Sequence, residues 1–171
     1  MGHPGFIVPP RRKEDICKLA TSVRGVFGQL ISGEGKLPIG VVYELLPDLL
    51  PGFEMEVKEP WEMGEDHGQT YPDKRRIYLR RDVYDGMCMG RGRDRFTGAH
   101  ELGHLFLHTR IGFARAMTSS TKIYCNSEWQ ANTFASALLI DEVHLKDCRS
   151  LEEVMERFGV SRDAASVRFR E

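Results

Sequence analysis

The segment HELGHLFLH, residues 100–108, holds three histidines and one glutamate whose types and spacing could bind a metal ion. On an α-helix, His100 and His104 lie on one face, one turn and about 6 Å apart along the axis. Two imidazoles at this spacing can ligate one tetrahedral zinc ion, and Glu101 then occupies the place of the general base in an HExxH motif. The segment also fits an ordinary amphipathic helix, and the motif alone does not decide between these interpretations.

His108 cannot ligate the same ion as His100 if the helix continues, because it lies about 12 Å further along the axis. Chains with a third histidine after HExxH turn the backbone with a glycine, in the pattern HExxHxxGxxH. Here Leu107 stands at the glycine position and Arg110 at the third histidine. The third ligand must therefore come from another part of the chain.

Glu128 in the segment SEWQAN is the best downstream candidate for that ligand. It falls in the first turn of a helix predicted over 127–140, where Ser127 and Gln130 have the spacing of a capping box. Asn132, one turn later, could accept a hydrogen bond from the second ring nitrogen of a ligand histidine. Taken alone, Glu128 could also be an ordinary acidic residue near a helix N-terminus, where the helix dipole favours negative charge. Three protein ligands would leave one coordination position open for water.

Together, RFTGAHELGHLFLH and SEWQANTFASALLI resemble the two motifs of the ImmA/IrrE metallopeptidases. The order of elements is similar from about Leu37 to Val160, with a departure at Ile140–Asp141, where Met-Pro is usual. The resemblance implies an α+β fold of the thermolysin-like minimal zincin type, with a small mixed or antiparallel sheet packed against the HExxH helix.

The resemblance also implies an activity and a site. It implies a metal-dependent endopeptidase that hydrolyses a peptide bond in a helix-turn-helix transcriptional repressor and so relieves repression. His100, His104 and Glu128 would be the ligands and Glu101 the base, with one Zn²⁺ per chain, or Mn²⁺ in its place.

Other candidate side chains keep two interpretations each. His108 could contact substrate or support the site from the next turn, or it could be a packing histidine. A zincin needs a donor for the developing oxyanion, and Tyr124 and His108 are candidates, with Tyr71 a weaker one. Each of the tyrosines also suits a structural role.

The remaining elements follow from hydrophobic periodicity and from turn residues. Helices are predicted over 13–31, 39–50 and 97–109, strands over 53–57, 67–71 and 76–80, a loop over 86–96 and an irregular connection over 110–126. The strand over 76–80 is read as an arginine-rich edge strand that could hold an extended substrate. Residues 1–150 are predicted to form the metallopeptidase domain. Residues 151–171 are predicted to form a helix-turn-helix-like appendage that packs on this domain or helps to hold the substrate.

Charge and sequence features narrow the expected binding partners and the expected cellular location. The formal net charge is −1, which gives no general attraction to nucleic acid or to an anionic membrane. Asp163 at the start of the last helix would repel phosphate, so direct DNA binding is not expected. The absence of a signal peptide predicts a cytoplasmic protein without a membrane partner. Two alternatives remain: a non-enzymatic regulator that binds a repressor or DNA around a structural metal, and a toxin-like effector on a zincin scaffold.

Overall fold

The computed structural model describes residues 5–31, 35–110, 115–116 and 121–169, and it has the α+β fold that the sequence predicts. The longer helices are α1 (Lys13–Val26), α2 (Ile39–Leu49), α4 (Arg81–Cys88), α5 (Gly92–Leu107), α6 (Ser127–Leu139), α8 (Leu151–Phe158) and α9 (Arg162–Phe169). The short helical segments are α3 (Pro60–Met63), α7 (Glu142–Leu145), η1 (Gly28–Leu30), η2 (Pro72–Lys74) and η3 (Ile123–Cys125). The strands are β1 (Phe6–Ile7), β2 (Glu54–Lys58), β3 (Gly68–Tyr71), β4 (Arg76–Arg80) and β5 (Arg115–Ala116).

The main sheet has three strands in the order β2-β4-β3 and is mixed, as expected. Strand β2 pairs parallel to β4, and β3 pairs antiparallel to it. The prediction that residues 76–80 form an edge strand is wrong, because β4 lies in the middle. Its Ile77 and Leu79 are fully buried, but alternation with arginines looks the same in the sequence of an edge strand and of a central one. Among the described strands of this sheet, β3 is the edge that faces α5.

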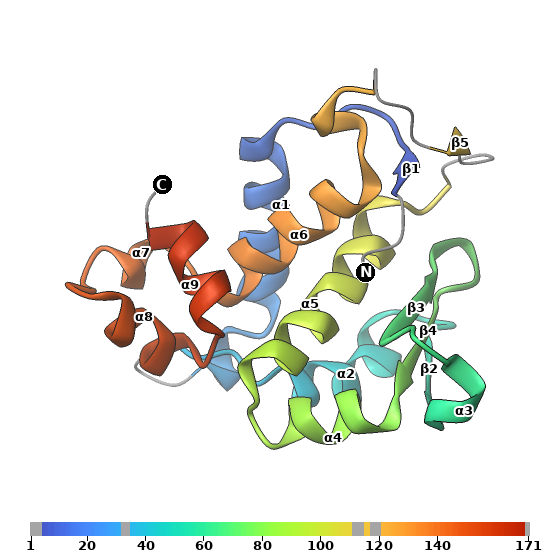
Figure 1. The fold of residues 1–171 in the computed structure, drawn as a ribbon, viewed down its shortest axis with the longest axis horizontal. Coiled ribbons are helices and arrows are strands. Elements are labelled where there is room, and N and C mark those ends of the chain that lie inside the picture. The colour runs from blue at the N-terminus through green and yellow to red at the C-terminus, as the bar shows by residue number, and fades with distance from the viewer. Residues whose placement is uncertain (1–4, 32–34, 111–114, 117–120, 170–171) are drawn as a thin grey trace.

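Helices α5 and α6 form the centre of the molecule, and they pack side by side with α1 against α6 (Figure 1). The sheet lies at one end of this pair and helices α7, α8 and α9 lie at the other (Figure 1). Leu102 and Leu105 of α5 and Phe134 and Leu138 of α6 belong to the hydrophobic core and are almost completely buried. The HExxH helix is therefore a core element, as the zincin fold requires.

Helix α5 begins at Gly92, five residues before the predicted start, and α4 occupies part of the predicted loop over 86–96. The loop prediction is wrong because its glycines serve packing. A Cβ on Gly86 would meet the Asp94 carboxylate at 1.8 Å, and one on Gly92 would meet the Val160 backbone at 2.6 Å. Close contacts between elements override the low helix propensity of glycine here.

One further boundary differs from prediction. Helix α1 ends at Val26, before the expected 31, and Phe27 leads into η1. Helix α2 spans Ile39–Leu49, within one residue of the predicted 39–50, and it continues through Pro47. Leu50 N donates to Leu46 O at 2.7 Å, which shows that the last turn keeps its hydrogen bonding around the proline.

The C-terminal helical pair is confirmed as α8 and α9, joined at Gly159, which adopts the left-handed conformation at φ 60°. Arg95 of α5 is buried and donates to the carbonyls of Phe158, Gly159 and Leu37. Burial lowers the pKa of Arg95 to about 10, helped by the charge of Arg24. The pair therefore packs on the rest of the chain, while a domain division between 150 and 151 stays a prediction.

None of the helices in the described part of the chain is long and apolar enough to cross a bilayer.

Candidate metal centre

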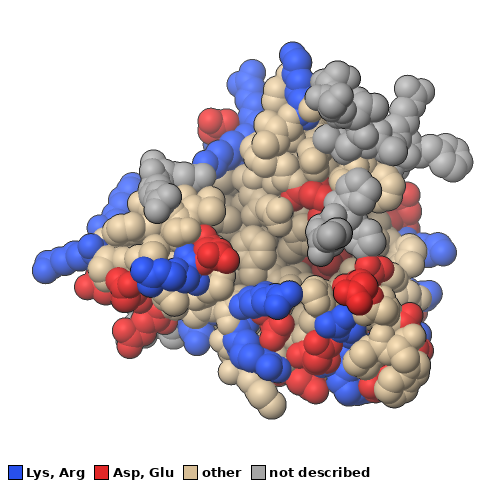
Figure 2. Space-filling view, viewed as in Figure 1, with Lys and Arg blue, Asp and Glu red and all other residues tan. Residues whose placement is uncertain are grey.

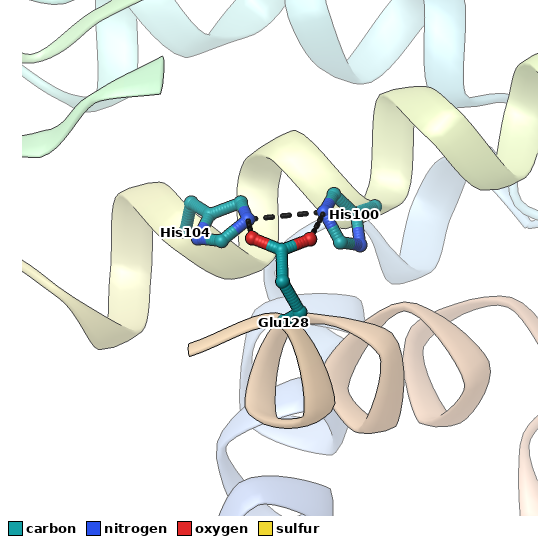
Figure 3. A group of neighbouring side chains, drawn as sticks. All are labelled: His100, His104 and Glu128. Atoms are coloured by element: carbon teal, nitrogen blue, oxygen red, sulfur yellow. Dashed lines mark hydrogen bonds and ion pairs between the residues drawn. The ribbon is translucent and has the colours of Figure 1, made fainter. Parts of the chain in front are cut away.

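His100 and His104 lie on one face of α5, and Glu128 reaches them from the first turn of α6 (Figure 3). The two Nε2 atoms are 3.0 Å apart. The Glu128 oxygens lie 3.2 Å from His100 Nε2 and 3.2 Å from His104 Nε2. Ligands at about 2.05 Å from a tetrahedral zinc lie roughly 3.3 Å from one another. The three residues could therefore hold a metal ion, and the structure brings together the set expected from the sequence.

Hydrogen bonds from neighbouring residues decide which nitrogen of each histidine ring faces the position between the three candidate ligands. His100 Nδ1 lies 2.8 Å from Asn132 Oδ1, so this nitrogen carries the proton and Nε2 keeps its lone pair. Asn132 thus has the contact that the sequence predicted.

A second chain of hydrogen bonds orients His104. The Gln130 amide nitrogen donates to Pro9 O at 2.9 Å and to Tyr124 O at 2.8 Å, so its Oε1 must face His108. His108 Nε2 lies 3.2 Å from this oxygen and donates to it, which leaves His108 Nδ1 as an acceptor. His104 Nδ1 lies 3.0 Å from His108 Nδ1 and donates to it. The Nε2 lone pair of His104 is therefore free to bind a cation.

Two imidazole lone pairs and one carboxylate thus converge without a donor among them. Such a cluster is stable only with a cation between the atoms, either a proton or a metal ion. Burial alone would lower the pKa of His100, but the hydrogen bond with Glu128 and the charges of Glu101 and Glu128 outweigh it, and the pKa is raised. Burial alone would raise the pKa of Glu128, but hydrogen bonds from His100 and His104 in their protonated form, together with their charge, hold it well below its usual range.

His108 has the opposite electrostatic setting. Burial lowers its pKa to about 4, and the neighbouring His104 acts in the same direction. His108 is therefore neutral at pH 7, as an acceptor for His104 must be. It also lines the cleft described below, so both of its predicted interpretations fit its position.

Glu101 lies between the histidine pair and the sheet, and its side chain is almost fully buried. The Thr70 hydroxyl of β3 donates to Glu101 Oε2. Gly68 lies against the same carboxylate, since a Cβ there would be 2.6 Å from Glu101 Oε1. The base candidate is therefore held by the edge strand.

A cleft of about 380 Å³ gives access to this region. It is bounded by Gly68–Tyr71 of β3, by His100, Glu101 and His104 of α5, by His108 at the C-cap of α5, by Glu128 of α6 and by Phe6 and Val8. Tyr71 lines the cleft, whereas Tyr124 does not and lies under Lys122 Nζ at 5.8 Å. The Tyr71 ring packs on Tyr78, with centroids 5.5 Å apart, so it lies on the opposite face of β3 from Thr70, and the oxyanion role of both tyrosines stays a prediction.

The start of α6 is fixed differently from the prediction. The N-cap is Asn126, whose side chain accepts from Glu128 N and Trp129 N, so the capping box of Ser127 and Gln130 is wrong. Ser127 Oγ instead accepts from Phe6 N at 2.9 Å. Gly5 packs on the same turn, where a Cβ would be 2.4 Å from Asn126 Oδ1 and 3.1 Å from Glu128 Cγ. The N-terminal strand thus holds the turn that carries Glu128.

Gly103, between the two motif histidines in space, permits the close approach of α5 and α6. A Cβ on it would lie 3.0 Å from both Cα and O of Ala131. The approach brings Glu128 within reach of the histidines. Sequence reasoning did not single out Gly103, Gly68 or Thr70, and it gave Gln130 only a capping role, because their importance depends on contacts between distant segments.

The fold and the site define an α+β protein of the zincin type. The sequence model of the Peptidase_M78 family, the IrrE N-terminal-like domain, matches residues 59–170, and the chain belongs to this family. The recognition of the ImmA/IrrE family is therefore confirmed. The matched range begins after α2 and extends through α9, later at both ends than the 37–160 expected from the motifs.

No curated protein matches the sequence. Among solved structures, a Mycobacterium tuberculosis transcriptional regulator is similar with a TM-score of 0.55 at 15% sequence identity. The similarity covers 86% of this chain and 45% of that chain, so this chain spans less than half of the regulator. At this identity the likeness concerns the fold alone.

Proposed function

We propose that this protein is a metal-dependent endopeptidase that cuts a helix-turn-helix transcriptional repressor and thereby relieves repression. The observation that carries the proposal is the buried Glu101 carboxylate beside the convergent group of His100, His104 and Glu128, at the base of an open cleft. A metal that served only to stabilise the fold would not need a carboxylate held beside it by Thr70. Membership of a peptidase family supports the same conclusion.

His100, His104 and Glu128 would hold the metal, with Zn²⁺ as the chemical default and Mn²⁺ as a variant. A divalent cation at this place would supply Lewis acidity, which acidifies water and polarises a carbonyl. Glu101 would take the proton from the attacking water and pass it to the leaving amine. Asn132, His108 and Gln130 would keep the ligand rings in the required tautomer.

Strand β3 would hold the substrate. It is an edge strand that lines the cleft, so its outward backbone groups can pair with an extended peptide. This assigns to β3 the role that sequence reasoning gave to residues 76–80. His108, which lines the cleft, and Tyr124 remain the candidate donors for the oxyanion, and Tyr71 remains the weaker one.

The repressor as substrate rests on the ImmA/IrrE resemblance and on the regulatory character of the structural neighbour's name. A cytoplasmic location would follow from such a substrate. The competing idea of a non-enzymatic regulator would keep the metal but would need no Glu101.

The first experiment measures metal by elemental analysis in the parent, His104→Ala and Glu128→Ala. About one equivalent of zinc or manganese in the parent and its loss in both variants is expected. The metal-loaded parent and Glu101→Gln are then incubated with candidate repressors, and products are identified by mass spectrometry. Site-specific cleavage by the parent alone supports the peptidase; a metal-loaded parent that behaves like Glu101→Gln on every repressor contradicts it.

A further inference from the structure

A second and larger hollow of about 660 Å³ lies next to the candidate metal centre. It is lined by Arg93, Phe96 and Thr97 of α5, by Trp129 and Thr133 of α6, and by Val167 of α9, and we name it the α9 groove. Figure 2 shows an uncharged hollow in the middle of this face, between the C-terminal helices on the left and the sheet on the right. Of the residues in the proposed chemistry, Asn132 alone borders this hollow.

The groove continues the face that carries the metal ligands. On α5, Phe96 and Thr97 precede His100 by four and three residues, so they share its face one turn earlier. On α6, Asn132 follows Glu128 by four residues and lines the groove, while its Oδ1 contacts His100. The cleft and the groove therefore meet at the contact between His100 and Asn132.

The walls of the groove favour one kind of occupant. Its apolar lining includes Phe96, Trp129 and Val167, and Val167 is 61% exposed. Among the described residues that line it, Lys13, Arg93 and Arg168 are cationic and Asp163 is the one carboxylate, and Lys13 and Arg168 each have an interaction partner. An apolar groove between helices suits the apolar face of an amphipathic helix, and the excess of positive charge favours acidic flanks on that helix.

We propose that the α9 groove binds an acidic amphipathic helix of the protein substrate, next to the segment that enters the cleft. The proposal rests on the proposed peptidase function and adds how a folded substrate is selected. Helix α9 is then a wall of the substrate site, and cleavage requires an extended segment joined to a helix. A nucleic acid fits less well, because it brings a phosphate at every step and Asp163 would repel it.

The protein carries its own reporter for this binding. It has two tryptophans, Trp129 in the groove and Trp61 on α3, which is 81% exposed. The experiment uses metal-free protein with Trp61→Phe and Glu101→Gln, and follows the fluorescence of Trp129. The probes are two synthetic amphipathic peptides with identical leucines, one with glutamates and one with lysines on the polar face.

A saturable change with the acidic peptide is expected, with affinity about tenfold weaker for the basic peptide. Val167→Asp should weaken binding of the acidic peptide by about tenfold or more, since it places a carboxylate in the apolar lining of the groove. Val143→Asp on α7 is the matched control, because Val143 is 74% exposed and lies outside the groove. Arg93→Glu should reduce the preference for the acidic peptide, whereas Lys18→Glu on the exposed side of α1 should not.

Equal affinity for both peptides, or equal weakening by Val143→Asp, would overturn the proposal. So would tighter binding of a single-stranded oligonucleotide, or self-association by sedimentation that Val167→Asp abolishes, which would assign the groove to a second copy. Because the assay uses Glu101→Gln without metal, its failure is separate from failure of the peptidase. A parent that cuts a repressor but binds neither peptide contradicts the groove alone.

Discussion

The Nδ1 atoms of His104, in the last turn of α5, and of His108, the C-cap of this helix, lie 3.0 Å apart. Because Gln130 fixes His108 as the acceptor, His104 must present its other nitrogen to the cleft. His108, which is not one of the three candidate metal ligands, thus decides which ring nitrogen of the candidate ligand His104 carries the proton.

Replacement of Gln130 by Leu, or of His108 by Phe, should weaken zinc binding by about 10–100-fold, a usual effect of losing an outer partner of a ligand histidine. The affinity is measured by competition with a chromophoric chelator, so the readout does not depend on a substrate. His67→Phe is the control, since His67 is half-buried but lies outside the cleft. Unchanged affinity in both variants would show that His104 does not need this chain of hydrogen bonds.

Thr70→Val removes the hydroxyl that donates to the Glu101 carboxylate. A lost hydrogen bond to a charged group corresponds to about 1.5–3 kcal/mol, so kcat on a cleaved repressor should fall by about tenfold or more. Thr70→Ser keeps the donor and should restore most of the rate. Zinc content should stay at the parent value in both, and a loss of zinc in Thr70→Val would instead indicate a wider disturbance of the site.

Gly103→Ala should lower zinc affinity, because the new methyl group meets Ala131 at 3.0 Å and pushes α6 with Glu128 away from α5. The same substitution at Gly25 on α1 meets nothing within 4 Å. Gly25→Ala should therefore leave zinc affinity unchanged and raise stability by about 0.5–1 kcal/mol. Chelator competition and urea unfolding measure the two quantities, and similar behaviour of the two variants would contradict the close-packing argument.

Asp141, one of the two residues that depart from the family motif, has a structural role. It accepts from Arg24 at 2.9 Å and from His144 N at 2.9 Å, and Arg24 is buried. Burial alone would raise the pKa of Asp141, but hydrogen bonds from His144 and the charge of Arg24 outweigh it and lower the pKa. Asp141→Asn should destabilise the protein by about 1–3 kcal/mol, as for a disrupted hydrogen bond to a charged group.

The sign of the pH dependence follows from the lowered pKa. The contribution of Asp141 is complete above the ordinary carboxyl range, near about pH 4, and is lost as the pH falls through the folded-state pKa. Urea unfolding of parent and Asp141→Asn should therefore differ at pH 7 and converge in acid. Glu142→Gln is the control, because its pair with Lys146 is 4.0 Å long and exposed, so its effect should be within about 0.5 kcal/mol. A difference that persists undiminished in acid would assign the effect to something other than ionised Asp141.

The sequence sufficed for those parts of the site that depend on helix periodicity. The shared face of His100 and His104, and the reach from Glu128 to Asn132, follow from one helical turn, and the structure brings these residues together. Their roles in metal binding and catalysis stay predictions. The contact of Thr70 with Glu101 joins residues 31 apart in the chain, and no local pattern records it.

The predictions that were wrong, for β4, for the start of α5 and for the cap of α6, also failed because they depend on contacts between distant segments. The place of β4 in the middle of the sheet depends on which strand pairs with it, and alternation along one strand does not contain that information. The early start of α5 depends on packing of Gly92 against the turn between α8 and α9. The cap of α6 at Asn126 competes with Ser127, and the partner that decides the competition is Phe6, 121 residues away.

The packing of Gly5 on the turn that carries Glu128 bears on how the protein is purified. A polyhistidine tag attached ahead of Gly5 would bring extra imidazoles to the mouth of the cleft, where they could compete for zinc with His100 and His104 or occupy the place of a substrate. A tag after α9 would instead emerge beside the α9 groove. Metal content and peptide binding should therefore be measured on protein from which any tag has been cleaved.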